Sequence, residues 1–287
     1  MAKQTYEKVL VDVDKQGIAT VTLNDPEHRN CITPTLSKEM NKVLDGIAPD
    51  RSIRVVVVRG AGEQSFCAGM SLKHFIEYRT HGWDLYNPGE SMMDWWGKLR
   101  RLPQPVIGAI NGYCIGGGFC VLDSCDLAIA SDRAIFSLSE INFGSLPGGG
   151  AMRAALDPMP IKPAMWLILT GKPIDAQEAC RTGLVNKVVP HKQLMAEVQD
   201  LAENLVTHPW QALEFCKRAA YGSKSIPDRF LGIEYETALS HWVSHVRPPK
   251  GGSSQEGLEA FVAKRYKPGL QTYDFRKSES AKNGKRK

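Results

Sequence analysis

The run Arg54–Arg59, RVVVVR, limits the possible folds more than any other segment of the chain. Its consecutive β-branched residues lack the alternation of a strand that faces water on one side, and they are typical of a strand covered on both faces. Two further apolar runs, Val106–Ile110 and Leu127–Ala130, also predict strands, and a helix-length segment separates them. Strand, helix and strand in this order indicate crossover connections, so we expect an α/β core.

The N-terminal segment predicts a hairpin followed by a helix. The β-rich runs Tyr6–Val13 and Ile18–Leu23 flank a Lys15-Gln16-Gly17 turn. Pro34–Ile47 then predicts a helix that Thr33 caps. Its apolar stripe, spaced as the inner face of a helix, consists of Leu36, Met40, Val43, Leu44 and Ile47.

From about Pro160 the pattern becomes helical. The helices that we expect are Ile161–Leu169, Asp175–Thr182, Lys192–Val206, Pro209–Tyr221, Pro227–His245 and Gln255–Lys264, with a flexible break at Arg247–Ser254 before the last. The expected domains are a core over residues 1–200, a C-terminal helical region over 201–267, and a basic tail over 268–287 that we expect to be disordered.

Composition excludes several classes of protein. Hydrophobic residues make up 43% of the 287 residues, enough for a sizeable core without a metal or disulfides. The seven cysteines are odd in number and form no C-x-x-C pair, which argues against a metal cluster or a disulfide framework. The chain has neither a run of 18 apolar residues nor a signal-peptide apolar region at its start, so we expect a cytoplasmic protein without a membrane span.

The net charge of +5 is concentrated at the C-terminus. The last residues carry six basic side chains and one acidic side chain, which account for the whole excess. A basic tail can contact nucleic acid, but a solvated terminus explains the same composition, so we do not expect a nucleic-acid partner.

Three segments carry residues that are suited to chemistry. Gly116, Gly117 and Gly118 follow a strand and open a helix, where main-chain amides lack internal partners and can bind an anion or a developing oxyanion. The turn Ala68-Gly69-Met70 follows another strand, and its amides could converge on the same oxygen. Glu140 lies in an apolar stretch, where a carboxylate is either a structural partner or an acid/base with a shifted pKa.

Together these segments resemble the crotonase (enoyl-CoA hydratase/isomerase) superfamily over roughly residues 6–270. Further marks of the resemblance are Glu27-His28-Arg29-Asn30, Cys125-Asp126-Leu127-Ala128-Ile129-Ala130, Leu169-Thr170-Gly171 and Gly183-Leu184-Val185-Asn186-Lys187-Val188-Val189-Pro190. The resemblance implies a spiral of repeated ββα units with a C-terminal helical trimerisation region, assembled as a homotrimer or hexamer. It also implies an acyl-CoA thioester substrate and neither a metal nor a cofactor beyond the coenzyme A of the substrate.

The resemblance assigns roles to particular residues. Oxyanion-hole amides are implied at Met70 and Gly117, and coenzyme A contacts near Arg29, Ala68, Met70 and Leu72. Common enoyl-CoA hydratases use two glutamates, one at the position of Glu140 and one two residues after the glycine triplet, where this chain has Cys120. This departure calls the two-carboxylate hydration into question. Cysteine as a replacement nucleophile is one interpretation, and a thiol without a catalytic role is the other.

Within the superfamily the chain is most similar to the hydroxycinnamoyl-CoA (feruloyl-CoA) hydratase-lyases. The string Ser139-Glu140-Ile141-Asn142-Phe143-Gly144 and the methionine at the oxyanion position carry this similarity. It implies hydration of an aryl-propenoyl-CoA and retro-aldol cleavage to an aldehyde and acetyl-CoA, with substrate contacts at Phe75, Ser139, Phe143 and Tyr235. The branch has tyrosine where Phe75 stands and usually tryptophan where Phe143 stands. The acyl group is therefore open between an aryl-propenoyl group without the phenol and another bulky enoyl group.

Other reactions and another class of protein remain as alternatives. Crotonase relatives also perform isomerisation, thioester hydrolysis or ring cleavage, and some bind RNA without catalysis. Retention of Glu140 together with both glycine-containing turns favours an enzyme, because a protein that only binds would not need them.

Overall fold

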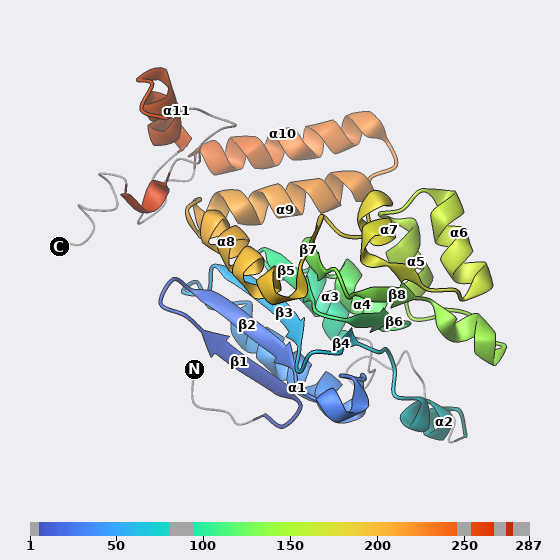
Figure 1. The fold of residues 1–287 in the computed structure, drawn as a ribbon. Helices are drawn as coiled ribbons and strands as arrows, with labels where there is room; N and C mark the ends of the chain where they lie inside the picture. Colours follow the sequence, from blue (N-terminus) through green and yellow to red (C-terminus); the bar gives the residue numbers. More distant parts are fainter. Residues whose placement is uncertain (1–5, 81–93, 246–253, 267–273, 278–287) are drawn as a thin grey trace. The chain divides into compact units, whose positions relative to one another are not determined.

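The computed structural model describes residues 6–80, 94–245, 254–266 and 274–277. The chain divides into two compact units, one of residues 1–102 and 106–199 and one of residues 103–105 and 200–287 (Figure 1). Most of the predicted tail and residues 247–253 of the predicted break lie outside the described residues. Among the described residues, no helix is both long and apolar enough to cross a bilayer.

The first unit contains two sheets. The six-stranded sheet has the order β1 (Val9–Val13), β2 (Ile18–Leu23), β3 (Val55–Gly60), β5 (Val106–Ile110), β7 (Leu127–Ser131) and β10 (Lys187–Val189). The four-stranded sheet has the order β4 (Ser65–Cys67), β6 (Tyr113–Ile115), β8 (Ile135–Ser137) and β9 (Ile174–Asp175). Only the β1–β2 and β8–β9 pairs are antiparallel among the described strands.

Successive strands alternate between the two sheets, and a helical segment closes each turn of the chain. The strand pairs are β3–β4, β5–β6 and β7–β8. Helices α2 (Leu72–Thr80) and α3 (Asp94–Arg100) follow the first pair, and α4 (Gly118–Asp123) follows the second. The third pair is followed by the 3-10 helix η2 (Ser139–Phe143) and by α5 (Ala151–Leu156) and α6 (Ile161–Thr170). This repetition is the ββα spiral that the family resemblance implied.

The predicted buried strand is confirmed. Val55–Val58 of β3 are all buried, and β3 pairs in parallel with β2 on one side and β5 on the other. The predicted helix over Pro34–Ile47 is α1, and its apolar stripe is buried. Thr33 caps α1, since its Oγ1 accepts a hydrogen bond from the Leu36 amide at 3.2 Å.

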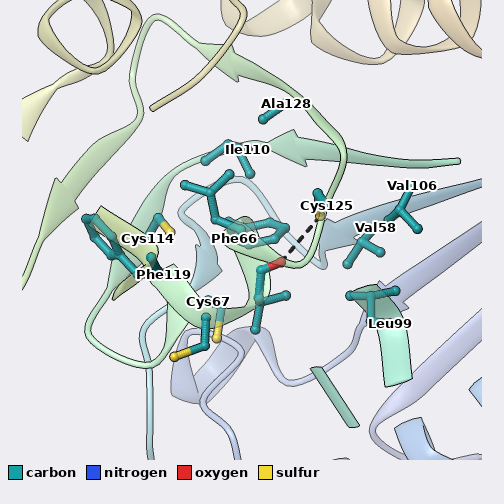
Figure 2. Packing of buried hydrophobic residues seen from close by; sticks show 14 of the residues in the cluster. Val58, Phe66, Cys67, Leu99, Val106, Ile110, Cys114, Phe119, Cys125 and Ala128 are labelled. Atoms are coloured by element: carbon teal, nitrogen blue, oxygen red, sulfur yellow. Dashed lines mark hydrogen bonds between the residues drawn. The ribbon is translucent and has the colours of Figure 1, made fainter. Parts of the chain in front are cut away.

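The core of the first unit fills the space beneath these strands. Figure 2 shows Phe66 and Phe119 among buried residues from several turns of the spiral, with Cys67 and Cys114 beside them. The Cys125 thiol donates to the Val121 carbonyl at 3.4 Å. Each such fully buried large side chain contributes about 1.5–3 kcal/mol to the stability of the fold.

The remaining helices follow the predicted order. The first unit also has α7 (Ala176–Arg181), η1 (Pro26–His28) and η3 (His191–Gln193), and α8 (Leu194–Val206) begins there and continues into the second unit. In the second unit α9 (Trp210–Ser225) packs against α10 (Arg229–His245), where Phe215 stacks on Trp242 at 4.4 Å between ring centroids. Helix α11 (Ser254–Val262) and the 3-10 helix η4 (Phe275–Lys277) complete the described chain.

The three-residue strands β4, β6 and β8 are absent from the sequence-based prediction. The glycine triplet therefore follows β6 rather than the longer strand β5, and α4 begins only at its third glycine, Gly118. Strands this short carry no readable periodicity, so their pairing becomes apparent only in the folded chain.

Candidate active site

A short strap, residues 29–32, lies alongside the Ala68–Ser71 turn. The Ala68 amide donates to the Arg29 carbonyl at 3.1 Å, and the Ile32 amide donates to the Gly69 carbonyl at 2.8 Å. The Ser71 amide in turn donates to the Ile32 carbonyl at 2.9 Å. The turn that follows β4 is therefore held by main-chain hydrogen bonds at three points.

These bonds determine the direction of the Met70 amide. Ile32 and Met70 form an isolated parallel bridge in which Ile32 bonds the residues on either side of Met70. Because the polar groups of successive residues in extended chain point to opposite sides, the N–H of Met70 points away from the strap. Within the described residues, no main-chain acceptor bonds this amide.

Gly117 lies directly against this turn. A β-carbon placed on Gly117 would be 3.4 Å from the Met70 amide nitrogen, and one placed on Gly69 would be 2.9 Å from the Gly117 amide nitrogen. Gly69 has a φ of +84°, a conformation that glycine adopts without strain. The Gly117 amide also lacks a main-chain acceptor within the described part of the chain. The two predicted donors are thus neighbours, and both are available to an external oxygen.

Glu140 lies next to this pair of amides. It is the second residue of η2, which begins two residues after β8. A β-carbon placed on Gly116 would be 2.7 Å from Glu140 Oε1 and 3.9 Å from its Oε2. The carboxylate therefore lies against the residue that immediately precedes the Gly117 amide.

The surroundings of Glu140 raise its affinity for a proton. Oε2 is buried and has no hydrogen-bond partner among the described residues. Burial raises the pKa of the Glu140 carboxyl above its ordinary value, because the charged form loses its hydration. A carboxyl that is partly desolvated and has an unused oxygen is suited to exchanging a proton with a bound molecule.

The apolar residues on the two sides of Glu140 differ in exposure. Phe136 and Leu138 before it are buried, but Ile141 and Phe143 after it are 41% and 64% exposed. The later residues of η2 are thus turned outward, whereas the residues before Glu140 pack into the core.

Cys120 is not suited to nucleophilic catalysis. It is buried, and its thiol donates to the Gly149 carbonyl at 3.4 Å. Burial, with further contributions from Asp123 and Glu140, raises the pKa of the thiol to about 12, so it stays protonated at neutral pH. Asp123 itself is ion-paired with Arg100. These observations favour a thiol that packs and donates a hydrogen bond.

The predicted coenzyme A positions lie along the strap and the turn. Arg29 is exposed in a left-handed conformation, with its guanidinium 5.5 Å from the ring centre of Tyr113. Ala68 and Met70 are half-buried in the turn, and Leu72 begins α2 with its side chain 57% exposed. Four of the predicted binding residues are thus brought together by the hydrogen bonds of the strap.

The predicted acyl-contact residues lie on different elements. Phe75 is half-buried on the first turn of α2, Ser139 is half-buried at the start of η2, and Phe143 is exposed at its end. Tyr235 belongs to the second unit, where its ring packs against Gly222. Its part in substrate binding stays a prediction.

Two residues at this site have roles that were not predicted from the sequence. Ile32 forms the bridge that orients Met70, and Gly116 gives room to the Glu140 carboxylate. The glycine triplet was a signal for Gly116. No sequence pattern indicated that the main chain of Ile32 would form hydrogen bonds with the residues before and after Met70. The described residues contain no cluster of three or more His, Cys, Asp or Glu side chains that could hold a metal ion.

The chain is similar to known proteins over most of its length. Residues 14–269 match the family model described as enoyl-CoA hydratase/isomerase. The chain is 36% identical to hydroxycinnamoyl-CoA hydratase-lyase from Pseudomonas fluorescens, over 93% of this chain and 97% of the relative. It is 33% identical to (E)-benzylidenesuccinyl-CoA hydratase from Thauera aromatica, over 86% of this chain and 93% of the relative.

A solved structure has the same fold. The enoyl-CoA hydratase from Bacillus anthracis aligns with a TM-score of 0.80 and 29% identity, covering 93% of this chain and 99% of that one. The family model accounts for most of the chain, and the site residues described above lie within the matched range, as does the ββα spiral. The chain belongs to the enoyl-CoA hydratase/isomerase family.

Proposed function

We propose that this protein adds water to an aryl-propenoyl-CoA and then cleaves the hydrated product to an aromatic aldehyde and acetyl-CoA. The observation that carries the proposal is the juxtaposition of the Met70 and Gly117 amides, which have no main-chain acceptor among the described residues, with the partly desolvated carboxyl of Glu140. The similarity to the hydroxycinnamoyl-CoA hydratase-lyase supports the choice of reaction within the family.

In the hydration step, the thioester oxygen accepts hydrogen bonds from both amides. Glu140 takes a proton from water as the water oxygen bonds to C3, and the electron pair of the double bond moves through C2 onto the thioester oxygen. Glu140 then returns the proton to C2. An oxyanion-hole donor of this kind typically contributes about 3 kcal/mol of transition-state stabilisation, because it needs no reorientation when charge develops.

The cleavage step uses the same groups. Glu140 accepts the proton of the 3-hydroxyl, the C2–C3 bond breaks, and the aldehyde leaves as the electron pair forms the thioester enolate. The enolate is held by the two amides and takes a proton at C2 from Glu140, giving acetyl-CoA. One carboxyl is sufficient for both steps because it gains and loses one proton in each.

The acyl group that we propose has an aromatic ring without a requirement for a phenol. Phe75, where the hydratase-lyase branch has tyrosine, offers a ring face but no hydrogen-bond donor. The benzylidenesuccinyl-CoA hydratase among the relatives also has an aromatic substrate in its name. Cinnamoyl-CoA is therefore the substrate that we expect to be turned over fastest.

For the coenzyme A moiety we propose that the exposed guanidinium of Arg29 meets a phosphate group. Arginine recognises phosphate oxygens through paired donors, and this side chain lies on the strap beside the oxyanion turn.

The exposed aromatic and aliphatic side chains of α10, among them Phe230 at 75% exposure and Leu231 at 55%, support the further proposal of a homotrimer or hexamer. Light scattering coupled to size-exclusion chromatography tests the assembly.

The reaction is tested by incubating the protein with crotonyl-, cinnamoyl- and feruloyl-CoA and separating the products by mass spectrometry. Acetyl-CoA together with an aldehyde supports the full reaction, and a gain of one water supports hydration alone. Free coenzyme A would instead indicate thioester hydrolysis, and an isomer of unchanged mass would indicate isomerisation. Either of the last two results would overturn the proposed function.

A further inference from the structure

We propose that Gly116 is a positioning residue for Glu140: its missing side chain lets the carboxylate lie against the main chain directly before the Gly117 amide. The proposal rests on the proposed function for its catalytic meaning, but its geometry is independent of the substrate. A β-carbon at position 116 would lie 2.7 Å from Glu140 Oε1 and 3.4 Å from Cδ. Close-packed interiors do not accommodate a contact this short without a shift of one partner.

The main chain at Gly116 is not free to move away. Its amide donates to the Ser137 carbonyl at 2.9 Å, and its carbonyl accepts from the Phe119 amide at 2.9 Å. The preceding residue, Ile115, is in register with Ser137 in the β6–β8 ladder. A methyl group at position 116 would therefore be held in place by the sheet.

The helix that carries Glu140 is held as well. The Ser145 amide donates to the Glu140 carbonyl at 3.1 Å, and the Asn142 side chain packs against Gly171 at the end of α6. With both main-chain segments fixed, the side chain of Glu140 is the part that must shift. A methyl group at position 116 would move the carboxylate away from the oxyanion donors.

One dipeptide thus connects the two halves of the site. Gly117 supplies an amide to the thioester oxygen, and Gly116 sets how closely the proton-transferring carboxylate approaches that oxygen. The competing explanation is that Gly116 is needed only for its left-handed backbone, with a φ of +52°. The two explanations predict different results when alanine replaces another glycine of positive φ, away from Glu140.

The test compares Gly116→Ala with Gly62→Ala. Gly62 has a φ of +74° in an exposed turn, and Pro26 Cβ, at 3.2 Å, is the contact that a new methyl group there would make. We expect Gly116→Ala to lower kcat by about a hundredfold or more with KM changed less than about threefold, since misplacing a reacting group by about 1 Å has effects of this size. We expect Gly62→Ala to keep kcat within about threefold. Equal activity of the two variants would overturn the proposal.

A stability measurement gives a readout that does not depend on turnover. If the methyl group meets the carboxylate, Gly116→Ala should lower the Tm more in the wild type than in a Glu140→Ala background, where the contact is gone. An equal loss of Tm in both backgrounds would show that only the backbone is strained. If Gly116→Ala alone does not fold, folding of the double variant supports the proposal, and misfolding of both contradicts it.

The two proposals fail in different ways. Normal turnover by Glu140→Gln would overturn the proposed function. The difference between the Tm losses of Gly116→Ala in the two backgrounds would still report the contact between position 116 and Glu140. If Gly116→Ala lowers the Tm equally in the wild type and in the Glu140→Ala background, and Glu140→Gln is inactive, the proposed function stands and the positioning role of Gly116 is refuted.

Discussion

The two halves of the candidate site are built from different parts of the chain. The oxyanion half consists of main-chain amides, held by hydrogen bonds between the strap at residues 29–32 and the turn that contains Met70. The acid/base half consists of the side chain of Glu140, which the 3-10 helix η2 carries. Its Oε1 lies against the main chain at Gly116. The first half is defined by backbone geometry and the second by one ionisable group.

This difference indicates where the site is sensitive to substitution. The oxyanion half should tolerate changes of side chain at Met70 but not an added side chain at its glycines. The acid/base half should tolerate strain in the neighbouring backbone. It should not tolerate a change in the charge or position of the Glu140 carboxyl.

The largest effect is expected from Glu140→Gln. The amide keeps the size of the side chain but cannot accept the proton, so we expect turnover of cinnamoyl-CoA to fall by about a hundredfold to ten-thousandfold. Binding of coenzyme A, measured by calorimetry, should stay within about threefold of the wild type. Turnover within about threefold of the wild type would remove Glu140 from the acid/base role.

The next largest effect is expected from Gly69→Ala. A β-carbon here would lie 2.6 Å from the Ile115 carbonyl oxygen and 2.9 Å from the Gly117 amide, so it would obstruct the oxyanion donors. Loss of one donor typically lowers kcat by about a hundredfold to a thousandfold. Met70→Leu is the matched control and should keep kcat within about threefold, because the donor at position 70 is main chain. Similar losses in both variants would contradict a main-chain oxyanion hole.

A smaller effect is expected from Cys120→Ala. The thiol donates one hydrogen bond to the Gly149 carbonyl, and such a bond contributes about 0.5–1.5 kcal/mol net. We therefore expect kcat to fall by about tenfold at most. Cys120→Ser keeps a donor and should be closer to the wild type. Complete loss of activity in both variants would instead make Cys120 a catalytic group and place a second ionisable residue in the acid/base half.

The smallest effect is a pH-dependent gain of stability in Glu140→Gln. Burial raises the pKa of the folded-state Glu140 carboxyl, so its favourable contribution is present below the unfolded pKa and is lost as pH rises through the folded pKa. Glutamine does not ionise, so we expect the Tm of Glu140→Gln to exceed that of the wild type at pH 8 and to approach it near pH 4.

Glu178→Gln is the control for this measurement. A hydrogen bond from Arg181 lowers the pKa of the Glu178 carboxyl, so its removal should not raise the Tm at pH 8. A Tm gain of equal size in both variants would show that the effect is one of net charge, without a specific cost of burying Glu140.

Much of the fold was predictable because its signals are local. The β-branched run of β3 indicated a strand covered on both faces, and the stripe of α1 with its Thr33 cap indicated a helix with the bounds that the structure shows. The short strands β4, β6 and β8 were not predicted, since three residues carry no periodicity and depend on pairing with distant strands.

The sequence by itself determined which residues are suited to the site: the glycines, the Met70 turn and a glutamate in a partly apolar segment. Only the tertiary structure decided that they meet. The bridge between Ile32 and Met70 and the contact between Gly116 and Glu140 join residues that are far apart in the chain. The desolvation of the Glu140 carboxyl likewise depends on packing around it. Local sequence specifies conformation and chemical type, whereas distances between segments arise only when the sheets pair and the core closes.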